Sequence, residues 1–573
     1  MTTKNIERLI DVAMGREKAG LVIKNAKVFN SFTGTFIDGD VAIDHGYIAA
    51  VGNYDGEVCH DAKGAWLTPG LFDGHVHIES GMVSPQEFTR TLVAKGTTTI
   101  IADPHEIANV AGVDGIRYIL EATEGAPVNV YVMLPSCVPA TPLEMGGAVL
   151  KAGDLAPFME HPRVLGLGEM MNFPGVVFKD PEVMAKLKMA AGRQVDGHAP
   201  GLTGPELAAY AAAGIRNDHE CMSAQEAADR LAVGISVLLR QGSAARNLLN
   251  LLPAVNDLNS RFCMMATDDR HPEDLLEQGH INYLLRLATG PGGLDVVTAL
   301  RLAVFNGPQH FGLRDLGAIA PGYRADLALF PDLKDFNPSH VWKDGLLTAE
   351  NGHCLRAPVK VDESAVRCGL RMDDVTLESL KVKADGPNLR VMGMIPGEIV
   401  TEHLVLQPQA VNNEYVSDPD NDLIKAAVLE RHRGSGHIGL GFLKGLGLKR
   451  GAIASTVAHD SHNLVVAGAT DEDILAAINE IRRIGGGLVV TEGGRIKDSL
   501  PLPLGGILSD RPMEEVAEKL ASMQKAVRGL GLTEGHDPFM TLAFMSLPVI
   551  PKLKLTESGL VDIDKFEIVP LVF

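Results

Sequence analysis

The residues best placed to do chemistry are two histidines one residue apart, His75 and His77, at the end of a short apolar run that begins at Leu71. Side chains alternate between the faces of a β-strand, so both imidazoles point the same way and can bind one metal ion. Gly70 and Gly74 bracket the run, which indicates a buried strand that ends at a site. Such a pair is weak evidence alone, so the prediction depends on further ligands elsewhere in the chain.

Apolar β-rich runs alternate with helical patterns through the middle of the chain, which predicts an α/β fold. Helical period and composition recur in the segments 181–191, 204–213 and 224–231. Eight β-then-α units within about 240 residues are typical of a (β/α)8 TIM-like barrel. The expected strands are residues 71–77, 97–103, 129–134, 164–170, 194–199, 214–219, 235–240 and 262–268.

Two further regions flank the expected barrel. Short strands between residues 21 and 66 and a second β-like piece from 317 to 347 are expected to pair into a small flanking β-sandwich domain. Strand patterns at 453–457, 464–467 and 487–491 and a helical pattern at 471–484 predict a separate C-terminal α/β domain. The 573 residues are therefore divided into 1–66 (N-terminal helix and first part of the small β domain), 67–316 (barrel), 317–379 (second part of the small β domain) and 380–573 (C-terminal domain).

The net charge of the chain, −20 from 52 basic and 72 acidic residues, disfavours large classes of partner. Phosphate backbones need a basic surface, and the sequence has no long Lys/Arg run, so we expect no nucleic acid partner. A small, uncharged or cationic substrate fits better. No segment reaches about 18 uninterrupted apolar residues, so we expect no membrane association.

The N-terminus and the cysteines both indicate a cytoplasmic protein. Residues 1–20 are charged and roughly helical in period, without the apolar centre of a signal peptide. The cysteines form no Cys-x-x-Cys pair and no close framework, which is typical of reduced thiols in the cytosol. They are Cys59, Cys137, Cys221, Cys263, Cys354 and Cys368.

The carboxyl ends of the expected strands supply further ligand types, and catalytic groups of a barrel lie at those ends. Imidazoles and carboxylates together bind divalent first-row metal ions. Each residue has a structural alternative, such as a helix cap for Asp268, but together these alternatives require several coincidences at one end of one barrel. The metal-ligand candidates are His75 and His77 at the end of strand one, Glu169 at the end of strand four, His198 at the end of strand five, His219 at the end of strand six and Asp268 at the end of strand eight.

The chemistry of two of these side chains assigns them roles. Glu169 is the natural bridge, because a carboxylate is needed where one group binds two metals. Asp268 can bind a metal weakly while it takes a proton from the bound water. It is therefore the candidate general base.

Three strings are more specific than the ligand pattern: DGHAPGL at 196–202, NDHE at 217–220 and ATDDRHPEDLL at 266–276. On these strings and the ligand order, residues 20 to 350 resemble the amidohydrolase superfamily. The chain more narrowly resembles the bacterial adenine deaminases, including their C-terminal domain. Hydantoinases and dihydroorotases typically use a carboxylated lysine where this chain has Glu169, so the ring-opening branch is disfavoured. The zinc deaminases that act on flipped bases need a Cys-x-x-Cys motif, which this sequence lacks.

The resemblance implies a metal-dependent hydrolase that converts adenine and water to hypoxanthine and ammonia. It implies a binuclear centre of Mn²⁺ or Fe²⁺ in which Glu169 bridges the metals, His75 and His77 bind one, and His198 and His219 bind the other. Water attacks C6 of adenine, and the general base relays its proton to the departing amine.

Other functions and assemblies stay open at this point. The alternative is another amidohydrolase that acts on a different aminated heterocycle or on a cyclic amide. A structural barrel protein is disfavoured because no metal-ligand candidate is missing. We expect a homo-oligomer, with a dimer favoured.

A deaminase also needs a group that protonates or hydrogen-bonds the purine ring nitrogens. The end of strand two offers His105 and Glu106 as catalytic candidates and Asp103 as a substrate-binding candidate, although a helix-capping loop explains them equally well. Weaker candidates for binding the substrate are Glu220, Asp269 and Arg270, with Arg240 at the end of strand seven as another.

Four histidines of the C-terminal domain, His432, His437, His459 and His462, invite a second metal site. Histidine clusters near glycine are typical of structural turns, and we favour that interpretation. A further possibility is that this domain reaches over the mouth of the barrel and contributes a substrate contact or a lid.

Overall fold

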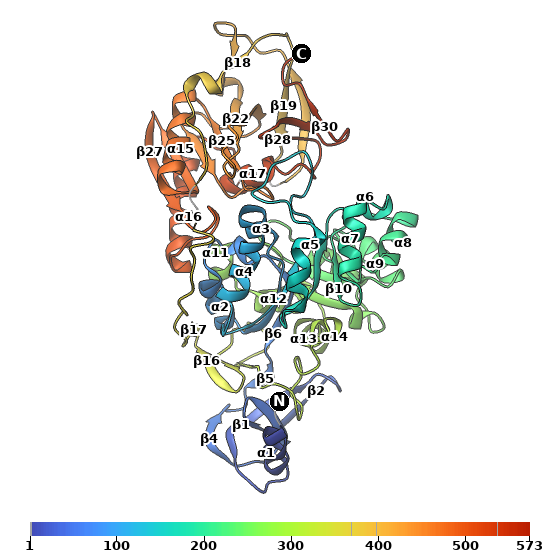
Figure 1. The fold of residues 1–573 in the computed structure, drawn as a ribbon. Helices are drawn as coiled ribbons and strands as arrows, with labels where there is room; N and C mark the ends of the chain where they lie inside the picture. The colour runs from blue at the N-terminus through green and yellow to red at the C-terminus, as the bar shows by residue number, and fades with distance from the viewer. Residues whose placement is uncertain (1–2, 368–369, 397, 536) are drawn as a thin grey trace.

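The computed structural model describes residues 3–367, 370–396, 398–535 and 537–573, so Cys368 lies outside the described residues. Figure 1 shows three stacked regions: a sheet at the N-terminal end, a central region coloured blue to green, and an orange and red C-terminal region. Within the described residues, no helix is both long and apolar enough to cross a membrane.

The flanking sheet consists of β1 (Ala19–Asn30), β2 (Thr35–Asp44), β3 (Tyr47–Gly52), β4 (Gly56–Asp61), β5 (Trp66–Pro69), β14 (Leu327–Phe330), β15 (His340–Lys343), β16 (Leu346–Glu350) and β17 (His353–Cys354). The predicted pairing of the two β pieces is confirmed, since Leu67 of β5 faces Leu329 of β14 in an antiparallel ladder. The arrangement of this flanking sheet as a small β-sandwich stays a prediction. Because β5 pairs with both β1 and β14, the nine strands form one continuous hydrogen-bonded sheet. The helix α1 (Thr3–Ala13) packs Leu9 and Val12 against this sheet.

Eight short strands form the centre of the middle region: β6 (Leu71–Val76), β7 (Thr97–Ala102), β8 (Asn129–Leu134), β9 (Val164–Met170), β10 (Gln194–Gly197), β11 (Asn217–Asp218), β12 (Ser236–Arg240) and β13 (Cys263–Ala266). Each lies within its predicted range. The strands form two parallel ladders, β6 to β10 and β11 to β13. Parallel strands are buried on both faces, which explains why β7 is a continuous run of buried β-branched residues.

Backbone hydrogen bonds join the two ladders at both edges. Beside β10, the amide of Arg216 donates to the carbonyl of Val195 at 3.2 Å. At the other edge, the amide of Asp268 donates to the carbonyl of His75 at 3.0 Å, and the amide of His77 donates back to Asp268 at 3.3 Å. The residues that follow the first and last central strands therefore meet.

The helices of the middle region surround these strands (Figure 1). They are α2 (Pro85–Ala94), α3 (His105–Ala111), α4 (Val113–Ala122), α5 (Ala152–Leu155), α6 (Phe173–Val177), α7 (Pro181–Met189), α8 (Gly204–Ala212), α9 (Ala224–Ala232), α10 (Leu248–Leu251), α11 (Pro272–Glu277), α12 (Ile281–Thr289), α13 (Val296–Val304) and α14 (Asn306–His310). The helices predicted at 181–191, 204–213 and 224–231 are confirmed as α7, α8 and α9.

The C-terminal region contains an eight-stranded sheet in the order β20-β19-β23-β22-β25-β24-β26-β27. These strands are β19 (Leu389–Met394), β20 (Thr401–Leu406), β22 (Leu423–Leu429), β23 (Ile438–Lys444), β24 (Ala452–Ser455), β25 (Leu464–Gly468), β26 (Gly487–Glu492) and β27 (Arg495–Pro501). Smaller pieces are β18 (Val382–Lys383), β21 (Glu414–Tyr415), β28 (Leu553–Thr556), β29 (Gly559–Asp562), β30 (Glu567–Val569), α16 (Met513–Arg528) and α17 (Pro538–Met545). The predicted strands at 453–457, 464–467 and 487–491 are confirmed as β24, β25 and β26.

The helix α15 (Asp471–Ile484) begins and ends where its sequence predicts. The Thr470 side chain accepts a hydrogen bond from the amide of Asp473, and acidic residues fill the first turn, where they complement the positive end of the helix dipole. Gly485 ends the helix at a φ of +78°, a conformation that glycine adopts without cost.

The C-terminal region docks on the middle region beside the short turn η1 (Ile78–Gly81). The amide of Ser509 donates to the carbonyl of Met82 at 2.8 Å, and the amide of Ser84 donates to the carbonyl of Ser509 at 3.0 Å. Because η1 directly follows His77, this contact places the C-terminal region next to the ends of the central strands.

Candidate metal centre

A buried aspartate aligns the first and last central strands. Asp73 Oδ1 accepts hydrogen bonds from the amides of His75 and Thr267, both at 3.1 Å. Its Oδ2 lies 3.0 Å from Nε2 of His280. A buried carboxylate is stable only when its oxygens are satisfied in this way. Asp73 thereby fixes the backbone from which His75 projects.

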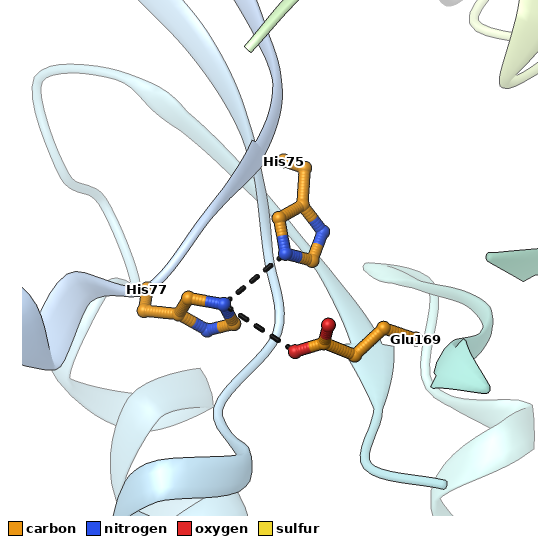
Figure 2. Close-up of side chains that lie close together, drawn as sticks. All are labelled: His75, His77 and Glu169. Carbon is orange, nitrogen blue, oxygen red and sulfur yellow. Dashed lines mark hydrogen bonds and ion pairs between the residues drawn. The ribbon is translucent and has the colours of Figure 1, made fainter. Parts of the chain in front are cut away.

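His75 in β6 and His77 just after it meet a glutamate at the end of β9 (Figure 2). Nε2 of His75 and Nε2 of His77 are 3.1 Å apart, and Nε2 of His77 lies 3.4 Å from Oε1 of Glu169. The Nδ1 atom of His77 is held by the carbonyl of Asp103 at 2.9 Å, so its Nε2 faces the cluster. All three side chains are at most 4% exposed.

The other oxygen of Glu169 faces a second pair of imidazoles. Oε2 lies 2.6 Å from Nδ1 of His198 and 3.1 Å from Nε2 of His219. The ring of His219 stacks on that of His75, with the centroids 4.0 Å apart. One carboxylate therefore lies between the two histidine pairs.

Asp268 completes the cluster from the end of β13. Its Oδ1 lies 3.1 Å from Nε2 of His77, and its Oδ2 accepts a hydrogen bond from Nη1 of Arg240 at 2.6 Å. Asp268 has a φ of +59°, which is uncommon for a residue with a side chain. Such strain persists where the surroundings enforce it, and it is frequent at functional sites.

Burial and charge together set the protonation states in the cluster. Burial and the neighbouring imidazoles of His219 and His77 hold the pKa of His75 well below its usual value, and neutral imidazole is the form that binds a metal. Burial alone would raise the pKa of Glu169, but the charges of His198 and His219 outweigh burial and hold this pKa well below its usual range. Glu169 therefore keeps its negative charge.

The donor atoms fit a divalent cation. Ligand atoms that each lie about 2.1 Å from one ion stand about 3 Å apart, close to the separations of 3.1 and 3.4 Å between His77 and its two neighbours. Several groups of described residues bring their ligand atoms within 4.8 Å of one another, and three of these groups overlap in the cluster around Glu169 and His75. The groups are His75, His77 and Glu169; Glu169, His198 and His219; and His75, His219 and Asp268.

Comparisons with known proteins agree with this donor set. Residues 66–348 match the amidohydrolase family, and residues 398–567 match the adenine deaminase C-terminal domain. Adenine deaminase 2 of Carboxydothermus hydrogenoformans is 54% identical over 99% of this chain and 100% of its own length. This chain belongs to the adenine deaminase family. The adenine deaminase of Desulfatibacillum aliphaticivorans is 48% identical over 99% of both chains, and a solved enamidase structure has 20% identity and a TM-score of 0.45 over 59% of this chain and 97% of its own.

Asp103 is predicted to bind substrate. In this adenine deaminase family member it instead contacts the backbone of Glu169, one residue of the candidate metal centre. Its Oδ2 accepts a hydrogen bond from the amide of Glu169 at 2.9 Å. Gly168 makes room for this contact, because a Cβ there would stand 2.0 Å from the same oxygen. Asp103 therefore positions the proposed bridging carboxylate through its backbone.

Replacing Gly168 with alanine is expected to lower metal affinity about 10- to 100-fold, the usual cost of disturbing a group that orients a metal ligand. The added methyl group must displace Asp103, which then no longer holds the backbone of Glu169. Competition with a chromogenic chelator measures the affinity. Gly153→Ala is the matched control, since a Cβ there meets nothing within 4 Å. An unchanged affinity in Gly168→Ala would refute this role of Asp103.

Arg270 does not join the cluster, and its assignment as a substrate-binding residue stays a prediction. The guanidinium donates to the carbonyl of Gly279 at 2.9 Å, to that of Asp274 at 3.3 Å and to the side chain of Gln278 at 3.0 Å. These groups belong to the last turn of α11 and the two residues that follow the helix. Arg270 thus stabilises a helix end.

The other predicted substrate-binding residues lie beside the cluster. Glu220 is 3.6 Å from Nε2 of His219 and forms an ion pair with Arg240, which also holds Asp268. Asp269 accepts a hydrogen bond from the Ser80 hydroxyl. Arg240 therefore links two of the carboxylates.

His105 and Glu106 extend the cluster towards the C-terminal region. Nδ1 of His105 lies 3.2 Å from Oε1 of Glu169, and its Nε2 lies 3.4 Å from Oε1 of Glu106. The carboxylate of Glu106 pairs with His459 through one oxygen and with His462 through the other. His105 is therefore an intermediate imidazole between two buried carboxylates.

His459 and His462 belong to a turn, and these contacts give both a partner in the middle region as well. Both lie in the loop after β24, which reaches over the ends of the central strands to Glu106. His432 contacts the carbonyl of Ser461 at 2.7 Å and His437 is exposed, and the turn interpretation of these two residues stays a prediction. The spacing of His459 and His462 in sequence was the available signal, but it could not identify a partner more than 350 residues away.

Proposed function

We propose that this chain catalyses the hydrolytic deamination of adenine to hypoxanthine and ammonia. The observation that carries the proposal is the position of Glu169, whose two carboxylate oxygens face separate histidine pairs, with Asp268 beside one of them. The relatives that match the full chain are named adenine deaminases, which favours this reaction over other amidohydrolase chemistry.

The donor set supports a binuclear centre of Mn²⁺ or Fe²⁺ as the proposed cofactor. His75 and His77 would hold one ion, His198 and His219 the other, and Glu169 would be shared. Imidazole and carboxylate ligands suit both metals. Bound ions of this kind lower the pKa of water towards neutrality and so supply the activation of the nucleophile.

Asp268 is the proposed general base and a weak metal ligand. Its Oδ1 takes a proton from the attacking water and passes it to the amine that leaves C6. Burial alone would raise the pKa of Asp268, but the charge of Arg240, together with His77 and His219, outweighs burial and holds this pKa well below its usual value. Asp268 is therefore ionised and ready to accept a proton at neutral pH, while Arg240 orients its second oxygen.

Hydrogen bonds to the purine ring nitrogens complete the proposed reaction. His105 is the proposed donor and the Glu106 carboxylate the proposed acceptor from a purine N–H, because they connect the Glu169 carboxylate to the adjoining C-terminal loop. Glu220 and Asp269 are proposed to contact the substrate from the other side. Asp103 acts on Glu169 and is not assigned a contact with adenine.

The proposal also includes the barrel fold of the middle region. We interpret the two parallel ladders, joined at both edges, as a (β/α)8 barrel whose mouth carries the metal centre. The division at residues 66, 316 and 379 and a dimeric assembly stay predictions.

An assay of adenine conversion tests the proposed function. Protein loaded with Mn²⁺ is expected to convert adenine to hypoxanthine, measured by ultraviolet absorbance, and metal-free protein is expected to lose the activity. Restoring Mn²⁺ to the metal-free sample should recover it. If adenine is not converted, ammonia release from other aminated purines, pyrimidines and triazines identifies the alternative amidohydrolase.

A further inference from the structure

Two connected cavities lie between the middle region and the helices α16 and α17. The larger has a volume of about 590 Å³, and the smaller of about 30 Å³. Both are lined by His271 and Glu273 of the middle region and by Gln524, Met540 and Phe544 of the C-terminal region. Because the two cavities share these lining residues, they adjoin, and we treat them as the outer and inner parts of one passage.

The inner cavity ends at the proposed catalytic groups. Asp269 and His459 both line it. The carboxylate of Asp269 also has an oxygen within 4.8 Å of the ligand atoms of His77 and Asp268. The passage thus leads from the outer cavity to the metal centre, with the C-terminal region forming one wall.

His459 is held rigidly in that wall. Its Nδ1 pairs with Glu106, its backbone amide donates to the carbonyl of Ala543 at 3.1 Å, and its ring stacks on Phe544 with the centroids 4.9 Å apart. Its Nε2 makes no hydrogen bond among the described residues. Both ring nitrogens of the neighbouring His462 have partners, because its Nδ1 accepts a hydrogen bond from the amide of Ala458 and its Nε2 pairs with Glu106.

Resting on the proposed function, we infer that the passage is the adenine-binding site and that Nε2 of His459 hydrogen-bonds the purine ring. The apolar faces of Phe544, Met540 and Ala543 suit a planar heteroaromatic base. Asp269 can accept a hydrogen bond from a purine N–H, and Nε2 of His459 can face a ring nitrogen. The wall therefore suits a base that has both hydrogen-bond donors and acceptors. The inner cavity has room for about one water molecule, so α17 must shift to admit the ring.

Replacing His459 with asparagine tests the contact directly. The asparagine amide can still donate to Glu106 from the position of Nδ1, but nothing replaces Nε2. We expect kcat/KM to fall about 10- to 100-fold, as when one hydrogen bond in a buried site is lost. Most of the loss should appear in KM, because the bound substrate already makes the contact. His437→Asn, at an exposed histidine of the same region, should stay within about two-fold of the wild type.

Phe544→Leu is a second variant that leaves the Glu106 network intact. It removes the ring that orients His459, and we expect a smaller loss in the same direction, again in KM. Metal content, measured by plasma mass spectrometry, should stay at the wild-type level in both variants. A KM within about two-fold of the wild type in both variants overturns the inference. Loss of metal in proportion to loss of activity overturns it as well, since His459 would then act on the metal centre.

If the proposed function is wrong, the assay of the wild-type protein shows it separately. If the wild-type protein does not convert adenine, that proposal fails on its own. The His459→Asn comparison is then made on the aminated heterocycle that the wild-type protein does convert. A KM effect on that base still supports a substrate contact from the C-terminal region.

Discussion

Asp268→Asn is expected to lower kcat by about 10³-fold while the metal content stays nearly unchanged. An amide is almost isosteric with a carboxylate, but it cannot take a proton from the attacking water. The five other proposed metal ligands remain, and Asp268 contributes only weakly to metal binding. Steady-state kinetics with adenine and mass spectrometry of bound metal together separate these two effects.

The matched control for Asp268→Asn is Asp295→Asn at the start of α13. Asp295 accepts from the amide of Thr298, and asparagine caps a helix as well as aspartate does. The control should retain full activity. Wild-type turnover in Asp268→Asn would rule out Asp268 as the base, and loss of both metals would show that its main role is ligation.

Glu169→Gln should abolish measurable turnover and remove at least one of the two proposed metals. Glutamine offers one oxygen in place of two, so its NH₂ group must face either the His77 side or the His198 side. Loss of a group that merely orients a metal ligand lowers metal affinity about 10- to 100-fold. Loss of a ligand shared by two metals should therefore lower metal affinity on the order of 10³-fold. Metal titration of the apoprotein, followed by calorimetry, measures the number of sites and their affinities.

Glu480→Gln, at the ion pair with Arg483 on α15, serves as the control for the charge change. Circular dichroism should show that both variants are folded. If Glu169→Gln binds two metals as tightly as the wild type, Glu169 is not shared between them.

The elements of the fold could be predicted because their signals are local. The ends of α15 are set by Thr470 and Gly485, and the central strands are short apolar runs between turn residues. The continuity of the flanking sheet could not be predicted. It depends on β5 pairing with strands on either side of it, and one of those strands lies more than 250 residues further along the chain.

Part of the candidate site could likewise be predicted from local signals, and part of it could not. His75 and Glu169 lie near the carboxyl ends of buried strands, and the rule that such ends converge was enough to predict that they meet. Arg270 obeys the same rule but turns away, because a loop does not preserve the alternation of a strand. His459 lies in another region, and only the docking of that region reveals its contact with Glu106.

The ladder between β5 and β14 also constrains how the chain can fold. Trp66 pairs with Phe330, so the whole middle region is inserted between two neighbouring strands. During synthesis β5 has an unpaired edge until the middle region has emerged, and such edges favour association between chains. A contact of such large sequence separation also forms slowly. Early collapse of the middle region, which brings the two strands together, should therefore protect the nascent chain from aggregation.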